Sequence, residues 1–438
     1  MSGMSRHFFC IMPHSENLDI QHIRVYNYPM NLKNCYIRTL AGMFLLLLSS
    51  SLFSCASNTA VSGNPSPKTD VQAAQVDKSP ELNPNTIDFI PDAEHVKYLG
   101  RSFFMDDKLL MCYSSTGAEF NVKAKRLDVT IIGDNRVSGS DNGSAARIVA
   151  FVNGERKLDT MILSKSKDYT IFNGEELIEG EVRIIKVSEA TSSLAAISKI
   201  TVDEDGTISP TAPRDLKIEF IGDSITCGYG VDDLDRNHHF KTSTEDNSKT
   251  YAYKTAANLD ADYSMVSVSG WGIISGYSGD GTKQASSQLP KYYDRLAVSW
   301  STIAAVDPKA VRWDFSSFVP DFIVINLGTN DASYTKGDSK KITEYKDAYI
   351  AFLKDIRSKN PDAHIICSLG IMGQDLCPAI ENAVSEYQTE TGDSKVTPLK
   401  FANQNMSDGI AADWHPSEKT HAKAAALLTA KIKELMNN

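Results

Sequence analysis

Four side chains in three short stretches have the chemistry that acyl transfer requires. Ser224 ends the sequence Gly222-Asp223-Ser224 after an apolar run, Asn330 follows a second apolar run, and Asp413 lies two residues before His415. Acyl transfer needs a hydroxyl nucleophile, a base, a group that orients the base, and donors for the oxyanion. These four residues can fill all of those roles.

We predict that Ser224 is the nucleophile, because a buried strand ending just before it would deliver it to the crevice where open α/β sheets bind ligands. His415 is the predicted base, since it lies in a loop just before a helical pattern. Asp413 can orient His415 only if the intervening loop curls back, and a backbone carbonyl can serve instead.

Three donors are predicted for the oxyanion: the backbone N–H of Ser224, the backbone N–H of Gly270 and the side-chain amide of Asn330. Glycine at position 270 lets the backbone approach a substrate without an intervening Cβ. Gly272 is the alternative for that role, because the sequence there reads Gly-Trp-Gly. The neutral amide of Asn330 donates without placing a charge beside the serine.

Neighbouring polar residues are predicted to be structural. Asp223 and Asp331 adjoin the candidate residues and can hydrogen-bond turn amides. Cys227 lies close to Ser224, where a buried thiol that fills space is the better interpretation. Residues 232–239 are rich in Asp and His, yet the Gly and Glu that a calcium loop needs are missing. We interpret this segment as a solvated loop and predict no metal site.

The blocks around these residues resemble those of the SGNH (GDSL-type) hydrolases, and within them the family 2 carbohydrate esterases. The phrases IGDSITCGYG, SGWG, VINLGTND and DWHPS carry the SGNH resemblance. Tyr98-Leu99-Gly100-Arg101 and Ser188-Glu189-Ala190, in a two-domain layout, carry the narrower one. The resemblance covers about residue 97 to the C-terminus. It implies deacetylation of plant polysaccharides, and some members of that family are described as Ser-His dyads.

Three tryptophans are interpreted from their positions in the sequence. Trp271 and Trp414 flank candidate catalytic residues, so we predict that they bind substrate by stacking on the apolar face of a sugar ring. Trp313 is predicted to pack in the interior.

The length of 438 residues favours two domains. In residues 210–438, strand patterns alternate with helical patterns, which predicts an α/β fold with a parallel sheet covered on both faces. This is a three-layer α/β/α sandwich of the flavodoxin-like sort, which the SGNH resemblance also implies. In residues 87–209, short β segments and the turn sequence Asn153-Gly154 predict a β-sandwich of jelly-roll type. That domain either binds glycan or walls one side of the active-site cleft.

The N-terminal residues 1–55 are predicted to be a secretory signal peptide. The apolar run 40–53 is too short for a comfortable membrane span and ends in Leu-Phe-Ser-Cys, a bacterial lipoprotein-like cleavage site. Cys55 would then be lipidated and would anchor the protein to a membrane of the cell envelope. A plain signal peptide or an uncleaved anchor is the alternative, and Met30 is the predicted start of translation.

The next segment, residues 56–86, is rich in Ser, Asn, Pro and Asp and is predicted to be a disordered linker. Beyond the signal peptide the cysteines are Cys112, Cys227, Cys367 and Cys377. Buried free thiols are the favoured interpretation, with a bridge between the last two as the alternative.

The amino-acid composition limits the classes of molecule that this protein can bind. The net charge of −10 leaves no basic stripe for nucleic acid and disfavours an acidic polymer, so a neutral acetylated polysaccharide or oligosaccharide fits best. We therefore expect a secreted carbohydrate O-acetyl esterase that acts on xylan or glucomannan through an acyl-enzyme and needs no cofactor. The alternatives are an SGNH esterase for a lipid, a thioester or acetylated peptidoglycan, and a non-catalytic glycan-binding lipoprotein.

Overall fold

A computed structural model of the protein describes residues 85–437. The predicted signal peptide, the predicted lipidation site Cys55 and all but the end of the predicted linker lie outside the described residues and stay predictions. Within residues 85–437, no helix combines the length and the apolar character needed to cross a membrane.

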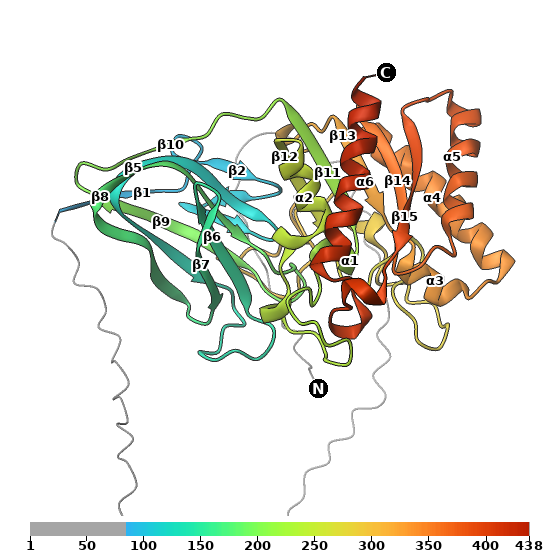
Figure 1. Ribbon diagram of the computed structural model, residues 1–438, viewed down its shortest axis with the longest axis horizontal. Coiled ribbons are helices and arrows are strands. Elements are labelled where there is room, and N and C mark those ends of the chain that lie inside the picture. The colour runs from blue at the N-terminus through green and yellow to red at the C-terminus, as the bar shows by residue number, and fades with distance from the viewer. Residues whose placement is uncertain (1–84, 438) are drawn as a thin grey trace, which may run out of the picture. The chain divides into compact units, whose positions relative to one another are not determined.

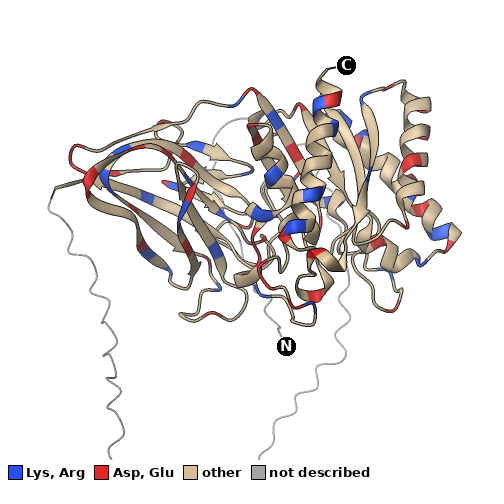
Figure 2. Ribbon diagram, viewed as in Figure 1, with Lys and Arg blue, Asp and Glu red and all other residues tan. Residues whose placement is uncertain are grey.

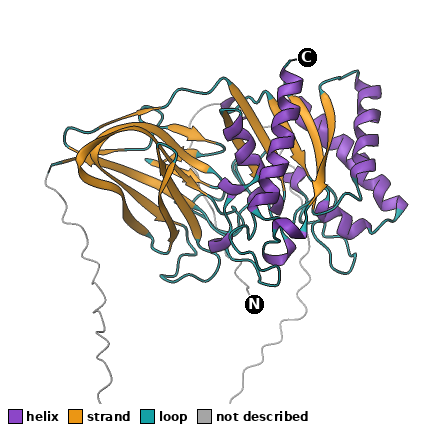
Figure 3. Cartoon of the chain, in the orientation of Figure 1, coloured by secondary structure: helices purple, strands orange, loops and turns teal. Residues whose placement is uncertain are grey.

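The first half of the described chain is an antiparallel sheet (Figures 1 and 3). Its strands are β1 (Thr86–Phe89), β2 (Lys97–Leu99), β3 (Phe103–Met105), β4 (Lys108–Met111), β5 (Thr116–Gly133), β6 (Ala146–Val152), β7 (Glu155–Ile162), β8 (Ser166–Lys186), β9 (Ala195–Asp203) and β10 (Thr207–Pro210). The order is β3-β4-β9-β5-β8-β6-β7, with β1 beside β9 and with β2 and β10 beside β5. These strands share one hydrogen-bonded network, so the finer description as a two-sheet jelly roll stays a prediction.

Strands β5 and β8 are much longer than their sequence patterns indicate. The sequence predicted only short β segments here, whereas β5 runs unbroken and pairs with β8 across two register shifts. Such bulges let a strand bend and keep its partner. The hairpin predicted at Asn153-Gly154 is confirmed: it joins β6 to β7, and both turn residues have positive φ, 50° and 80°.

The second half is built on a parallel sheet with the order β12-β11-β13-β14-β15. Its strands are β11 (Leu216–Gly222), β12 (Ala261–Ser267), β13 (Phe322–Asn326), β14 (His364–Ile371) and β15 (Val396–Asn403). This is the 2-1-3-4-5 order of flavodoxin-like folds, in which the first strand lies beside the switch point where ligands bind. β11, which leads to Ser224, pairs with β12 and with β13.

Helices cover both faces of this sheet (Figure 1). They are α1 (Ser224–Cys227), α2 (Tyr251–Asn258), α3 (Thr329–Thr335), α4 (Ser339–Lys359), α5 (Cys377–Thr391) and α6 (Glu418–Met436). Ile221 and Ile325 pack in the core that α4 and α5 share, whereas Phe220 and Val324 pack in the core of α2 and α6. Successive side chains of a strand therefore serve opposite faces, and the predicted three-layer arrangement is confirmed.

Buried ion pairs join the antiparallel sheet to the parallel one. Arg101 is fully buried and donates to the backbone oxygens of Tyr293 and Arg295 and to Glu219 in β11. Lys97 contacts both Glu119 and Asp262. Buried charges need such partners, because an unpaired one would be costly. The β domain is thus bonded to the parallel-sheet half through its interior.

Elsewhere, Figure 2 shows Lys and Arg interspersed with Asp and Glu along the strands and helices. Cys112, Cys227, Cys367 and Cys377 are all buried and free, so the alternative of a bridge between Cys367 and Cys377 is wrong.

Candidate active site

Ser224 lies at the tight turn between β11 and α1. Gly222 permits this turn, because a Cβ there would lie 2.0 Å from Oγ1 of Thr226. Asp223 caps α1 by accepting the N–H of Ile225 at 3.0 Å, as predicted for a structural acid. Ser224 itself is 7% exposed, at the carboxyl end of the central strands.

The hydroxyl of Ser224 donates to Nε2 of His415, with 2.9 Å between Oγ and the nitrogen. Nδ1 of His415 faces the backbone oxygens of Ala412 and Asp413, at 3.2 and 3.1 Å. A proton on Nδ1 leaves Nε2 free to accept from the serine, so these carbonyls select the tautomer that a general base needs.

The carboxylate of Asp413 is not the partner of His415, which corrects the predicted role. Its oxygens accept from the Tyr229 hydroxyl, the Phe240 N–H and the His239 ring, each at 2.9 Å. Asp413 and Trp414 both have left-handed backbone angles, with φ of 49° and 65°. Because non-glycine residues rarely adopt them, we infer that the three hydrogen bonds hold this turn, which in turn aims the two carbonyls at Nδ1.

Tyr229 is a residue of this site that the sequence analysis did not single out. Its ring stacks on His415, with centroids 4.0 Å apart, and on Phe240, at 4.1 Å. The hydroxyl of Tyr229 reaches Asp413, so one side chain restrains both the base and the turn that orients it. The only sequence signal was its place in the IGDSITCGYG block, which says nothing of its contacts.

The three predicted oxyanion donors differ in the hydrogen bonds that they already make. Within residues 85–437, neither the N–H of Ser224 nor that of Gly270 has a protein acceptor. Nδ2 of Asn330 donates to the Trp271 oxygen at 2.8 Å and, more weakly, to Asp223 at 3.3 Å. Gly272, the alternative donor, already uses its N–H on Ser287, so Gly270 is the better candidate.

The second buried acid, Asp331, fixes the loop that follows Gly270. Its carboxylate accepts the N–H groups of Ile273, Ile274 and Ser275 at 2.7–3.0 Å. Burial raises the pKa of Asp331 to about 6, although these hydrogen bonds oppose the shift. Burial, reinforced by the charge of Asp331, raises the pKa of Asp223 to about 7 against the effect of its hydrogen bond from Ile225. Both side chains bond turn amides, in agreement with the structural roles predicted for them.

Comparison with known proteins places this geometry in a family. Residues 220–423 match the GDSL-like lipase/acylhydrolase family, and residues 98–212 match the carbohydrate esterase 2 N-terminal domain. A solved family two carbohydrate esterase from Clostridium thermocellum, in complex with cellohexaose, is 30% identical with a TM-score of 0.66, covering 78% of this chain and 99% of that one. The chain belongs to the family 2 carbohydrate esterases.

Two curated relatives give the family its named activities. The cellulase/esterase CelE of Acetivibrio thermocellus is 33% identical over 78% of this chain, which spans only 40% of CelE. An acetylxylan esterase / glucomannan deacetylase of Cellvibrio japonicus is 25% identical, covering 78% of this chain and 89% of that one.

The two tryptophans predicted to bind substrate lie in different environments. Trp271 is 5% exposed and packs edge-on against Tyr292 in the core, so it offers no open ring face and that prediction is wrong. Its backbone oxygen instead holds Asn330. Trp414 is 52% exposed, with the guanidinium of Arg236 over its ring at 4.4 Å, so its role in binding stays a prediction. Trp313 packs against the core, as expected.

Charged side chains of the loop 232–239 pair with other residues of the protein. His238 pairs with Asp233, and His239 pairs with Asp413. The loop therefore supports the turn that carries His415.

Substituting Asp413 by Asn tests whether this acid works through its carboxylate charge on His415. Asparagine tolerates left-handed angles and its oxygen can accept from Tyr229 and Phe240, so the turn should persist. We expect kcat on an aryl acetate to fall by no more than about tenfold, whereas loss of a true triad acid costs about 10⁴-fold. A loss near 10⁴-fold, in a protein with unchanged circular dichroism, would contradict this reading.

The pH dependence follows from the state of His415. Burial, partly opposed by the two carbonyl hydrogen bonds, lowers the pKa of His415 to about 4. A protonated His415 cannot accept the serine proton, so kcat/KM should stay level down to about pH 5 and halve near pH 4. The measurement is a pH profile on an aryl acetate, with circular dichroism at each pH to detect unfolding. A midpoint near 6.5 would show an ordinary histidine.

Proposed function

We propose that this protein is a secreted carbohydrate O-acetyl esterase that removes acetyl groups from polysaccharides of the xylan and glucomannan type. The observation that carries the proposal is the 2.9 Å contact between Ser224 and a neutral His415, beside two backbone N–H groups that have no protein acceptor among residues 85–437. A nucleophile, its base and oxyanion donors in one place are the requirements of ester cleavage.

In the proposed reaction, Oγ of Ser224 bonds to the acetyl carbon while Nε2 of His415 takes the serine proton. The tetrahedral oxyanion accepts hydrogen bonds from Ser224 N–H, Gly270 N–H and the Asn330 amide. The ester bond to the sugar then breaks, and His415 returns the proton to the leaving sugar hydroxyl. Water attacks the acetyl-enzyme by the same path, which releases acetate and restores the serine.

The proposed substrate class draws on the relatives. One is named as an acetylxylan esterase and glucomannan deacetylase, and another binds cellohexaose in its solved structure. The net charge of −10 further favours a neutral polymer over an acidic one.

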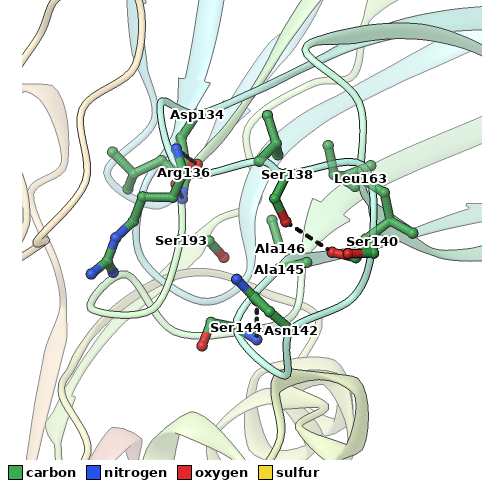
Figure 4. Close-up of a pocket in the computed structure, with 13 residues that line it drawn as sticks. Asp134, Arg136, Ser138, Ser140, Asn142, Ser144, Ala145, Ala146, Leu163 and Ser193 are labelled. Atoms are coloured by element: carbon green, nitrogen blue, oxygen red, sulfur yellow. Dashed lines mark hydrogen bonds between the residues drawn. The ribbon is translucent and has the colours of Figure 1, made fainter. Parts of the chain in front are cut away.

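The β domain gives little support to the alternative that the protein is a glycan-binding module. The cavity beside the loop after β5 measures about 160 Å³ and is lined by both polar and apolar side chains, including Ser138, Ser140 and Leu163 (Figure 4). Pockets for drug-sized ligands are about 300–1,000 Å³. This cavity has no room for an oligosaccharide, so it does not support an independent binding function.

Acetate release by the purified full-length chain tests the proposal. The substrates are acetylated xylan, acetylated glucomannan and an aryl acetate, each assayed with a chelator, and Ser224→Ala is the blank. We expect release from at least one polymer that survives the chelator and disappears in the variant. Release from the aryl acetate alone would favour another ester as substrate, and no release from any of the three by a folded sample would contradict an esterase.

A further inference from the structure

Glu189 lies between β8 and β9 of the antiparallel sheet but contacts the catalytic half. Its Oε2 accepts the N–H of Ser269 at 2.9 Å and the thiol of Cys227 at 3.7 Å. Ser269 immediately precedes Gly270, and Cys227 ends the helix that begins at Ser224. One carboxylate of the β domain thus touches both segments that hold the backbone oxyanion donors.

The contact with Ser269 matters because of where Gly270 lies. The Gly270 carbonyl accepts the N–H of Tyr277 at 2.8 Å, while Glu189 holds the preceding N–H at Ser269. The N–H of Gly270 lies between these two anchors, and its φ of 77° is one that glycine tolerates. With both flanking groups fixed, the direction of this N–H is set before substrate arrives, which is what an oxyanion hole requires.

Glu189 is itself held rigidly. Its N–H donates to Oε2 of Glu245 at 2.8 Å, and its carbonyl accepts from the buried Lys186 at 2.9 Å. Burial, reinforced by the charge of Glu189, raises the pKa of Glu245 well above its usual range. The nearby Lys186 moderates the cost of burying the Glu189 carboxylate.

A metal ion is the competing explanation for this cluster. In the described part of the chain, Glu189, Cys227 and Glu245 are the only three residues of ligand type whose donor atoms all lie within 4.8 Å of one another. Metal binding requires a deprotonated thiol. Burial raises the pKa of Cys227 well above its usual range, and Oε2 of each carboxylate already accepts a backbone N–H. The contacts therefore describe a hydrogen-bond network.

We propose that Glu189 is a positioning residue for the oxyanion hole, through which the β domain aligns the N–H of Gly270 for catalysis. This inference rests on the esterase function proposed above. It gives the β domain a part in the reaction that needs no glycan binding.

The test compares Glu189→Ala, Glu189→Gln and a control in the full-length protein on an aryl acetate. Loss of one oxyanion donor costs about 10²–10³ in kcat, so a misaligned donor in Glu189→Ala should cost about 10- to 100-fold, with KM unchanged. The oxygen of Glu189→Gln can still accept from Ser269, so kcat should return to within about fivefold of wild type. The control, Lys97→Met, cuts a contact to Asp262 across the same boundary, together with one to Glu119 within the β domain, and should stay within about twofold.

The outcomes separate the two proposals. A lower melting temperature for Glu189→Ala with kcat unchanged would overturn the positioning role, and so would equal losses in the Ala and Gln variants. An active wild-type chain combined with fully active Glu189 variants would overturn this inference alone. A wild-type chain that cleaves no ester would overturn the esterase function and this inference together. Dependence of the wild type on a metal, shown by chelation, would also overturn it.

Discussion

Replacing Ser224 by Ala, or His415 by Ala, should lower kcat on an aryl acetate by about 10⁵- to 10⁶-fold. The 2.9 Å contact makes the two residues one functional unit, because the hydroxyl is nucleophilic only while Nε2 accepts its proton. The double variant should therefore be no slower than either single variant. The residual rate, about 10³- to 10⁴-fold above water, would come from oxyanion donors and binding.

Active-site titration gives this prediction a control that does not depend on turnover. A phosphonate ester should label the wild-type chain once and should not label Ser224→Ala. Iodoacetamide should leave activity intact, because Cys227, the other nucleophile near the site, is fully buried and its pKa is raised well above the usual range. Labelling of Ser224→Ala, or inactivation by the thiol reagent, would show that a residue other than Ser224 is the nucleophile.

The catalytic half was predictable because local patterns and tertiary structure agree there. The alternation of strands and helices predicted for residues 210–438 is present in the structure from β11 through α6. Buried parallel strands appear in a sequence as continuous apolar runs, and helices appear as apolar residues with a helical period. Each element can therefore be recognised from its own residues. The β domain was predictable only in class, because polar stretches such as Lys123–Arg126 continue a long strand through a bulge that no local pattern reveals.

The site was predictable where the chemistry depends on residue type and not where it depends on backbone direction. Serine, histidine and asparagine in their motifs indicated Ser224, His415 and Asn330. The orienting group of His415 is a pair of backbone carbonyls, which every residue carries, so no residue type could identify it. The roles inferred for Tyr229 and Glu189 depend on contacts between distant segments, and a single sequence does not record such contacts.

Replacing Asn330 by Ala should lower kcat on an aryl acetate by about 10²- to 10³-fold while KM changes little. The reason lies in the two hydrogen bonds of its amide. The 2.8 Å bond to the Trp271 oxygen fixes the side chain, and the 3.3 Å contact with Asp223 is weak enough to be exchanged for the oxyanion. An interaction made only in the transition state affects kcat and leaves substrate binding alone.

The isosteric variant Asn330→Asp distinguishes hydrogen-bond donation by the amide from the space that the side chain fills. It keeps the shape of the side chain but places a carboxylate, which cannot donate, against the developing negative charge and beside the buried Asp223. It should therefore be no more active than Asn330→Ala, although it fills the same space. If the Asp variant retained wild-type kcat, the amide would only fill space, and the oxyanion would have to be held by the N–H groups of Ser224 and Gly270 alone. The alignment of Gly270 by Glu189 would then contribute correspondingly more to kcat. The Asn330 and Glu189 variants together therefore measure how much each oxyanion donor contributes to kcat.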